Sequence, residues 1–262
     1  MILAINCGNT RMTVGCVDSN RTVKSVFRIP TDKKETDFGY AAKIKQILEL
    51  QGVTPDQLRG AALSSVVPSL TDTLVRALRI LSGTEPLVIG AGIKTGLHLC
   101  INDPGTVAAD LVVTAIAVKE EYPLPSIVVD MGTATTLSAL DATGKFIGCA
   151  IAPGVSLALD ALVERTALLP NIEIKPPKNA IGTNTADCMK SGILYGAAGA
   201  VDGLIERFES EMNPTPATLV VTGENAEQIF PYCRHTLFND PHLALKGLRI
   251  VWDKQRTAKQ KN

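Results

Sequence analysis

Two short stretches of the chain combine the residue types that bind phosphate groups. "ILAINCGNT" at 2–10 and "SIVVDMGTA" at 126–134 each consist of an apolar strand, a polar residue at its end (Asn6 or Asp130), one further residue, and a glycine in a polar corner. Glycine lets backbone amides approach an anion, and the neighbouring hydroxyl and amide groups add donors. Gly and Asn are also the usual residues of β-hairpin turns, so a single copy of this corner would favour a simple turn over a phosphate site.

The occurrence of two copies at matched positions favours phosphate binding over two unrelated turns. A third apolar strand follows each corner, "TVKSVFRI" at 22–29 and "KFIGCAIA" at 145–152. This pattern predicts a duplicated strand-strand-strand-helix unit whose two corners lie on opposite walls of a nucleotide-binding cleft. Asp130 ends an apolar strand, and carboxylates in such positions are usually paired or hold a cation.

The elements between the two stretches alternate in the way that is typical of α/β domains. Amphipathic patterns, caps and breakers predict strands at 60–67 and 86–90 and helices at 36–50, 69–81, 156–168, 185–212 and from 242 onward. Asp103-Pro104 predicts the start of a helix that continues to 122. Because Pro123 and Pro125 interrupt the chain before the second copy, we expect two tandem domains, 1–123 and 124–262.

Composition limits the kinds of partner that the protein can have. The chain has 262 residues, 45% of them apolar, and 26 basic residues balance 26 acidic ones, so no overall field attracts nucleic acid or an anionic membrane. The six cysteines form no CxxC pair, which favours reduced thiols. The first residues lack the features of a signal peptide, and no apolar run is long enough to span a membrane. We therefore expect a cytoplasmic protein.

Six stretches, which are spread along essentially the whole chain, carry a resemblance to a known family. They are "GNT" at 8–10, "SSVVPSLT" at 64–71, "PLVIGAGIKTGL" at 86–97, "DMGTATT" at 130–136, "IAPGVSLALDAL" at 151–162 and "IGTNTADCMKSGILYGAAGAVDGLIER" at 181–207. Through them the chain resembles the type III pantothenate kinases, which belong to the superfamily of acetate and sugar kinases, actin and heat-shock chaperones. The resemblance implies two tandem ribonuclease-H-like (actin-like) α/β domains with an interdomain nucleotide cleft.

The resemblance also implies an activity, namely ATP-dependent phosphorylation of pantothenate at the start of coenzyme A synthesis, by a homodimer that uses Mg²⁺ and K⁺ or NH₄⁺. Asp110 would be the catalytic base, and Asp130 would lie at the monovalent-cation site. The residues expected around ATP are Asn6, Gly8, Asn9, Thr10, Arg11, Thr13, Gly132 and Thr133, and those expected around pantothenate are Ile101, Ala108, Ala109, Asp110, Leu111 and Thr185.

Two of these residues, Asp110 and Thr185, could also have a purely structural role. An aspartate can accept the proton of an attacking hydroxyl, but Asp110 also suits the first turn of a helix, where the helix dipole favours an acid. Thr185 could cap a helix beside Asn184 as well as touch a substrate.

Three departures from the family pattern bear on the chemistry. Asn6 replaces the acid of the first corner, so we expect weaker Mg²⁺ binding there, or else a site rebuilt around a neutral residue. Leu111 replaces an arginine of the Gly-Ala-Asp-Arg motif, and Ile101 replaces a substrate tyrosine. "VVTGEN" at 220–225 has one glycine where the family usually has two. Two alternatives therefore stay open: a kinase with a changed substrate, and a nucleotide-binding regulator with little catalysis.

Overall fold

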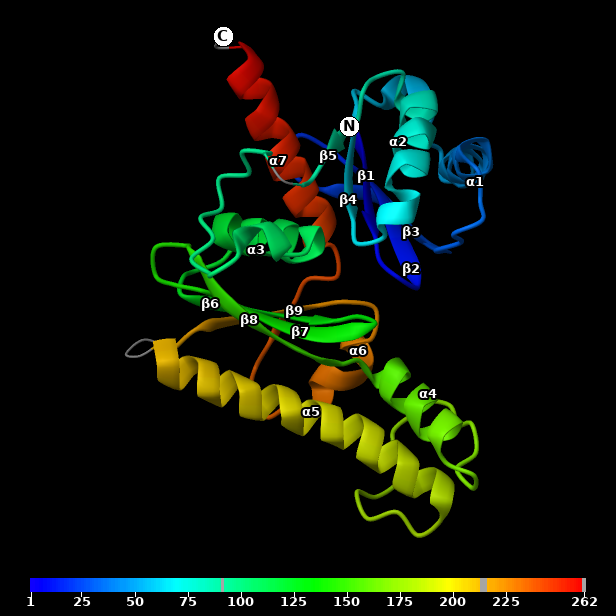
Figure 1. Cartoon of the computed structure of the whole chain (residues 1–262), viewed down its shortest axis with the longest axis vertical. Helices are drawn as coiled ribbons and strands as arrows, with labels where there is room; N and C mark the ends of the chain where they lie inside the picture. Colours follow the sequence, from blue (N-terminus) through cyan, green and yellow to red (C-terminus); the bar gives the residue numbers. More distant parts are fainter. Residues whose placement is uncertain (91, 213–215, 261–262) are drawn as a thin grey trace. The chain divides into compact units, whose positions relative to one another are not determined.

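The computed structural model describes residues 1–90, 92–212 and 216–260, and these residues form two five-stranded sheets flanked by helices (Figure 1). Two compact units contain one sheet each. The first unit comprises residues 1–97 and 102–120 and the C-terminal segment from His242, and the second comprises residues 98–101 and 121–241. This grouping differs from the division at 123/124, because the C-terminal helix packs with the first unit.

The sheet of the first unit has the order β3-β2-β1-β4-β5. Its strands are β1 (Ile2–Cys7), β2 (Arg11–Val17), β3 (Val23–Pro30), β4 (Ala61–Ser65) and β5 (Leu87–Val88). β1 pairs antiparallel with β2 and parallel with β4. The helices of this unit are α1 (Asp37–Leu50), α2 (Pro68–Ser82), α3 (Ala109–Glu121) and α7 (Leu243–Gln260).

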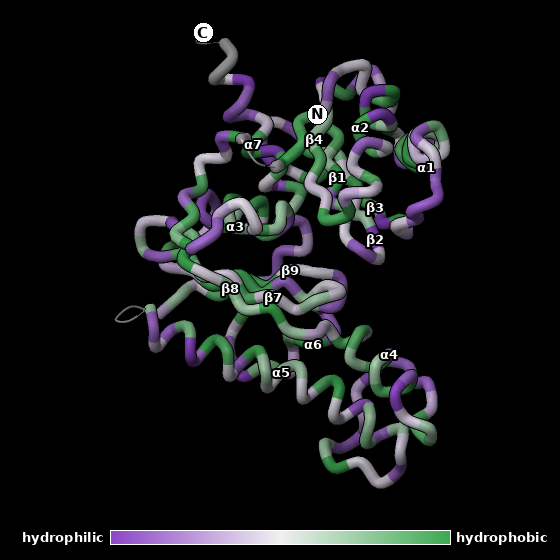
Figure 2. Tube along the Cα trace, in the orientation of Figure 1, coloured by the Kyte–Doolittle hydropathy of each residue, from purple (hydrophilic) through white to green (hydrophobic). Residues whose placement is uncertain are grey.

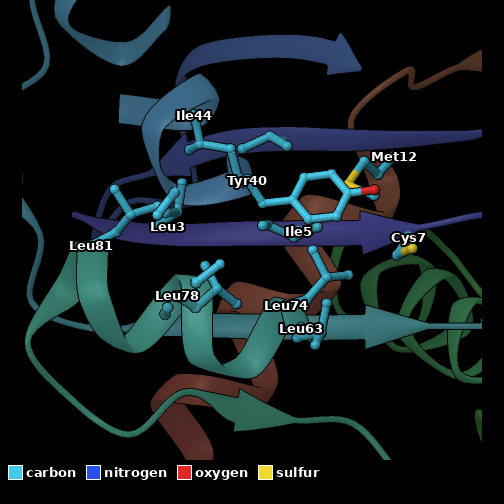
Figure 3. Packing of buried hydrophobic residues seen from close by; sticks show 14 of the residues in the cluster. Leu3, Ile5, Cys7, Met12, Tyr40, Ile44, Leu63, Leu74, Leu78 and Leu81 are labelled. Carbon is cyan, nitrogen blue, oxygen red and sulfur yellow. The ribbon is translucent and has the colours of Figure 1, made fainter. Parts of the chain in front are cut away.

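The two faces of this sheet are covered by different helices. The side chains of Leu3 and Ile5 lie on one face of the sheet, and that face packs against Tyr40 and Ile44 of α1 and the leucines of α2 (Figure 3). α7 packs against β1, β2 and β4, where a Cβ on Gly15 would lie 2.6 Å from Leu245 Cδ1. Asn6 lies between Ile5 and Cys7 on β1, so the strand alternation directs its side chain to the face opposite α1 and α2.

The second unit repeats this plan with the sheet order β10-β9-β6-β7-β8. Its strands are β6 (Ser126–Met131), β7 (Ala134–Leu140), β8 (Phe146–Pro153), β9 (Thr218–Thr222) and β10 (Phe238–Asn239), and its helices are α4 (Val155–Arg165), α5 (Thr185–Met212) and α6 (Ala226–Ile229). A core cluster joins this sheet to α4 and α5. Figure 2 shows hydrophobic residues concentrated in the central strands, whereas the helices carry both kinds of residue.

The predicted duplication of the strand unit is confirmed by details that the sequence pattern does not contain. The register of the second strand pair shifts between Cys16 and Val17 in one copy and between Ala139 and Leu140 in the other. In the hairpin that follows, the Oδ1 atoms of Asp18 and Asp141 each accept two backbone N–H bonds. The third residue after each aspartate has a left-handed φ, 62° at Arg21 and 75° at Gly144.

Most of the predicted helices are confirmed, and Thr36 caps α1 by accepting from Gly39 N. The continuous helix from 104 to 122 is wrong. Pro104–Thr106 form a short 3₁₀ turn, closed by bonds from Gly105 N and Thr106 Oγ1 to Asp103, and Val107 is extended at φ −66° and ψ 123°. Gly105 is a poor helix residue, so the turn does not propagate and α3 begins at Ala109.

Other predicted bounds were too long. The strand predicted at 86–90 is only the two-residue β5, and α4 ends at Arg165 because Thr166 has an extended backbone.

Candidate functional site

The corner after β1 is a turn fastened by Thr31 at the end of β3. Gly8 N donates to Arg11 O at 3.0 Å, Thr31 Oγ1 donates to Gly8 O at 2.8 Å, and Thr31 N donates to Thr10 O at 3.0 Å. A Cβ on Gly8 would lie 3.0 Å from Arg11 O. Asn9, Thr10 and Arg11 are exposed. The first corner therefore presents exposed polar groups from a backbone that a neighbouring hydroxyl holds in place.

Asn6 lies in a polar row that crosses three strands. Thr13 of β2 and Ser64 of β4 are its direct partners in the strand pairing, so the three side chains share one face of the sheet. Ser64 is fully buried, and the Oδ1 atom of Asn6 is also buried. Neither Ser64 Oγ nor Asn6 Oδ1 has a hydrogen-bond partner in the described part of the chain.

The corner after β6 is built from closely packed backbone. A Cβ on Gly154 would lie 2.4 Å from Gly132 O and 2.5 Å from Thr133 O, and Gly154 N donates to Thr133 O. Gly154 is also the N-cap of α4, so the start of that helix lies directly against the corner. On the other side, Asn225 Nδ2 donates to Gly132 O at 3.3 Å. This compact turn beside a helix N-terminus suits an anion such as phosphate.

Asp130 is the counterpart of Asn6 in the second unit, with Thr136 and Thr222 as its partners in the strand pairing. The loop after β9 approaches its carboxyl group closely. A Cβ on Gly223, whose φ is 104°, would lie 2.6 Å from Asp130 Oδ1. The single glycine of "VVTGEN" is therefore required both by its backbone conformation and by the space beside Asp130.

Asp110 lies in the first turn of α3 and is partly buried, and burial raises the pKa of its carboxyl group. The hydrogen bond from Leu111 N to Asp110 Oδ1, at 2.8 Å, acts in the opposite direction on this pKa. A raised pKa brings a carboxylate closer to the range in which it is an effective general base. The residues beside it differ in exposure: Leu111 is buried, whereas Ile101, Ala108 and Ala109 are partly exposed.

Asn184, and not Thr185, caps the N-terminus of α5. Asn184 Oδ1 accepts from Asp187 N at 2.9 Å, and Asn184 Nδ2 donates to Asp187 Oδ2 at 2.9 Å. The Thr185 side chain is exposed and makes no hydrogen bond to another described residue. The capping role is thus filled by its neighbour, which leaves the Thr185 hydroxyl available to a ligand.

The predicted site residues are divided between the two units. The first unit contains Asn6, the corner from Gly8 to Arg11, Thr13 and the segment Ala108–Leu111, and the second contains Ile101, Asp130, Gly132, Thr133 and Thr185. The predicted nucleotide cleft stays a prediction. The sequence did not single out Ser64, Thr31 or Gly154, because each contributes through strand pairing or close packing, although Ser64 lies in "SSVVPSLT" and Gly154 in "IAPGVSLALDAL". Among the described residues, no cluster of three His, Cys, Asp or Glu could hold a metal.

Comparisons with known proteins identify the family. The family model of type III pantothenate kinases matches residues 2–207. This chain belongs to the type III pantothenate kinase family. A type III pantothenate kinase of Moorella thermoacetica is 41% identical over 254 residues, covering 97% of this chain and 99% of that protein. One from Geobacter sulfurreducens is 38% identical over 256 residues, covering 98% and 100%.

Solved structures place the fold in the actin-like class. The activator of the 2-hydroxyisocaproyl-CoA dehydratase from Clostridium difficile, with bound ADPNP, superposes with a TM-score of 0.59 at 10% identity and covers 100% of this chain and 97% of its own. Component A of the (R)-2-hydroxyglutaryl-CoA dehydratase from Acidaminococcus fermentans gives a TM-score of 0.57 at 13% identity, with 98% of each chain covered. At these identities the likeness shows the fold alone.

The described helices include none that could cross a membrane.

Proposed function

We propose that this protein transfers the γ-phosphoryl group of ATP to the primary hydroxyl of pantothenate and so forms 4'-phosphopantothenate, the first step of coenzyme A synthesis. The observation that carries the proposal is the identity of about two residues in five with type III pantothenate kinases over almost the whole length of both chains. Asp110 and the two glycine corners support it, because phosphoryl transfer needs a base for the acceptor hydroxyl and groups that hold the phosphates.

The first role that we assign to the chain's own residues is to hold the ATP phosphates. In the first corner these residues are Asn6, Gly8, Asn9, Thr10, Arg11 and Thr13, and in the second they are Gly132 and Thr133. The close packing of Gly154 and Gly223 against the second corner supports this role, because a Cβ at either position would clash with the corner and displace its backbone.

Asp110 is the proposed catalytic base. Its carboxylate accepts the proton of the pantothenate hydroxyl while that oxygen attacks the γ-phosphorus, and ADP leaves with the electrons of the broken bond. Ile101, Ala108, Ala109, Leu111 and Thr185 are the proposed contacts of pantothenate. Leu111 is buried and apolar, so it offers no replacement for an arginine clamp.

Cations belong to the same proposal. Mg²⁺ usually binds to one or two carboxylates together with substrate phosphates, and Asp130 is the only carboxylate in the two strand-end rows. We therefore propose Asp130 as a ligand both of Mg²⁺ and of the monovalent cation, K⁺ or NH₄⁺.

A homodimer is proposed from an exposed apolar surface of the second unit. β8 is an edge strand whose Ile151 is 70% exposed, and Leu157 of α4 is 48% exposed. Exposed apolar side chains on a sheet edge and an adjacent helix are typical of subunit interfaces. Ile151→Lys should shift the protein to monomers in analytical ultracentrifugation, and an unchanged dimer would place the interface elsewhere.

The proposed location is the cytoplasm, where ATP is available.

A changed acceptor is the second candidate, favoured by the apolar residues Leu111 and Ile101. A coupled ADP-release assay with ATP, Mg²⁺ and K⁺ or NH₄⁺ tests both candidates. We expect turnover with pantothenate that falls by at least about a hundredfold in Asp110→Asn. Turnover with other small alcohols but not with pantothenate would support the changed acceptor, and nucleotide binding without any turnover would support a regulator.

A further inference from the structure

The polar row Thr13–Asn6–Ser64 contains two buried oxygens that the chain itself does not satisfy. Ser64 is 0% exposed, and its Oγ has no hydrogen-bond partner in the described part of the chain. The same holds for Asn6 Oδ1, although Asn6 as a whole is only half-buried. Buried polar atoms are nearly always satisfied in folded proteins, so these two call for a partner from outside the chain.

The spacing of the strands limits what that partner can be. Asn6 and Ser64 are direct partners on parallel strands, which lie about 4.8 Å apart, and their side chains share a face. One water molecule can bond to both oxygens at once. A water in this position would donate to Asn6 Oδ1 and accept from the Ser64 hydroxyl. Such bonds fix which end of the carboxamide points inward.

We infer that Ser64, through a buried water, holds the Asn6 carboxamide with its oxygen inward and its NH₂ group toward the corner at Gly8, so that Asn6 binds an ATP phosphate directly as a donor and not as a metal ligand. The inference rests on the proposed position of ATP at the first corner. Asn6 Nδ2 has no partner among the described residues, which leaves both of its hydrogens available.

The chemistry of the two ends of the amide favours this orientation. The buried Oδ1 is out of reach of a hydrated cation, whereas an NH₂ donor suits a phosphate oxygen. Of the two alternatives that the sequence leaves open, this is the site rebuilt around a neutral residue. A carboxylate at position 6 would then repel the phosphates.

Binding of ATP in EDTA tests the inference, because a direct phosphate donor acts without metal and a metal ligand does not. Titration calorimetry should show that Asn6→Ala weakens metal-free ATP about tenfold, the effect of one charge-assisted hydrogen bond. Asn6→Asp should weaken it at least as much, and Ser64→Ala should weaken it about threefold. Ser126→Ala is the matched control. Ser126 is also fully buried, and its Oγ has no hydrogen-bond partner among the described residues, but it begins β6, at the end away from the corner.

Three results would overturn the inference: wild-type affinity for metal-free ATP in Asn6→Ala, tighter ATP binding in Asn6→Asp only when Mg²⁺ is added, or equal affinities in Ser64→Ala and wild type. If Ser64→Ala unfolds, Ser64→Cys keeps the volume, weakens the hydrogen bond and takes its place. A crystal structure of the wild-type ATP complex adds a second measurement, since it must show a water between Asn6 Oδ1 and Ser64 Oγ. Turnover of pantothenate by the wild type is measured separately, so a wrong acceptor leaves these affinities unchanged.

Discussion

The two strand-end corners share a fold down to the register shift and the hairpin that follows, yet they are held in different ways. In the first copy the hydroxyl of Thr31 donates to Gly8 O. In the second copy Gly154 takes the place of Thr31, and its backbone contacts the corner where a side chain would not fit. A helix begins at Gly154 but not at Thr31, since α1 starts only at Asp37.

The strand-end residues differ in charge as well. Asn6 is neutral and flanked by Thr13 and Ser64, whereas Asp130 is acidic and flanked by Thr136 and Thr222. The duplicated backbone thus supplies the same position twice, and single substitutions give it different chemistry. In our proposal the second copy binds a cation and a phosphate, and the first contacts a phosphate through a neutral side chain, in the same unit as the proposed base.

The largest effect is expected from Asp110, the proposed base in the first unit. Asp110→Asn should lower turnover by roughly 10² to 10⁴, the range for loss of a general base, with a much smaller change in ATP affinity. Steady-state kinetics and calorimetry measure the two quantities. Asp56→Asn, an exposed aspartate of the same unit, is the control and should keep wild-type turnover. Full activity in Asp110→Asn would move the base to another residue.

The pKa of Asp110 adds a dependence on pH. Burial raises this pKa in the folded protein above its unfolded value, so the folded state favours the protonated acid and loses stability as the pH rises through the folded pKa. Asp110→Asn removes that loss. The variant should therefore gain unfolding temperature over the wild type as the pH increases from about 4 to 7. If the difference in unfolding temperature between the variant and the wild type does not change with pH, the pKa of Asp110 is not raised by burial.

The next largest effect is expected from the polar contacts that fasten the long helices α5 and α7. In the second unit the buried Asp202 of α5 accepts bonds from Arg234 N, His235 N and His235 Nδ1, the last at 2.7 Å. In the first unit Arg249 of α7 pairs with Asp253 and donates to Val17 O. Asp202→Ala should lower the free energy of unfolding by about 3 kcal/mol, because it leaves several donors unpaired. Urea denaturation measures this, and Glu206→Ala, which removes only an exposed ion pair with Arg234, should cost less than about 1 kcal/mol.

A direct test of the two corners compares Gly154 with Thr31. A methyl group on Gly154 displaces the backbone of Gly132 and Thr133, so Gly154→Ala should weaken ATP binding about tenfold or more. Thr31→Val removes one hydrogen bond and should weaken it about threefold. Gly192→Ala adds a methyl group in α5 where nothing lies within 4 Å, and it serves as the control. Equal losses at 154 and 31 would mean that the corners do not differ in rigidity.

The sequence predicted the duplication and the α/β class because both depend on local patterns that recur along the chain. It did not single out Ser64, since that residue lies beside Asn6 only through the parallel pairing of β1 with β4. It also extended the helix before α3 through Gly105, where hydrogen bonds to Asp103 close a separate turn. Residues that act through long-range pairing or a local competing turn leave no periodic pattern in the sequence.

The smallest effect separates two neighbouring residues at the start of α5. Thr185→Ala should raise the KM for pantothenate a few-fold, about the effect of one neutral hydrogen bond, and leave the unfolding temperature unchanged, because the exposed hydroxyl makes no bond within the described chain. Asn184→Ala should leave the KM for pantothenate unchanged and lower the free energy of unfolding by about 1 kcal/mol, because loss of the bond from Asp187 N removes the helix cap. Thr185→Ser keeps the hydroxyl and should restore the KM. If Thr185→Ala lowers the unfolding temperature as much as Asn184→Ala and leaves the KM as it was, Thr185 is part of the cap and its place in the pantothenate site is lost.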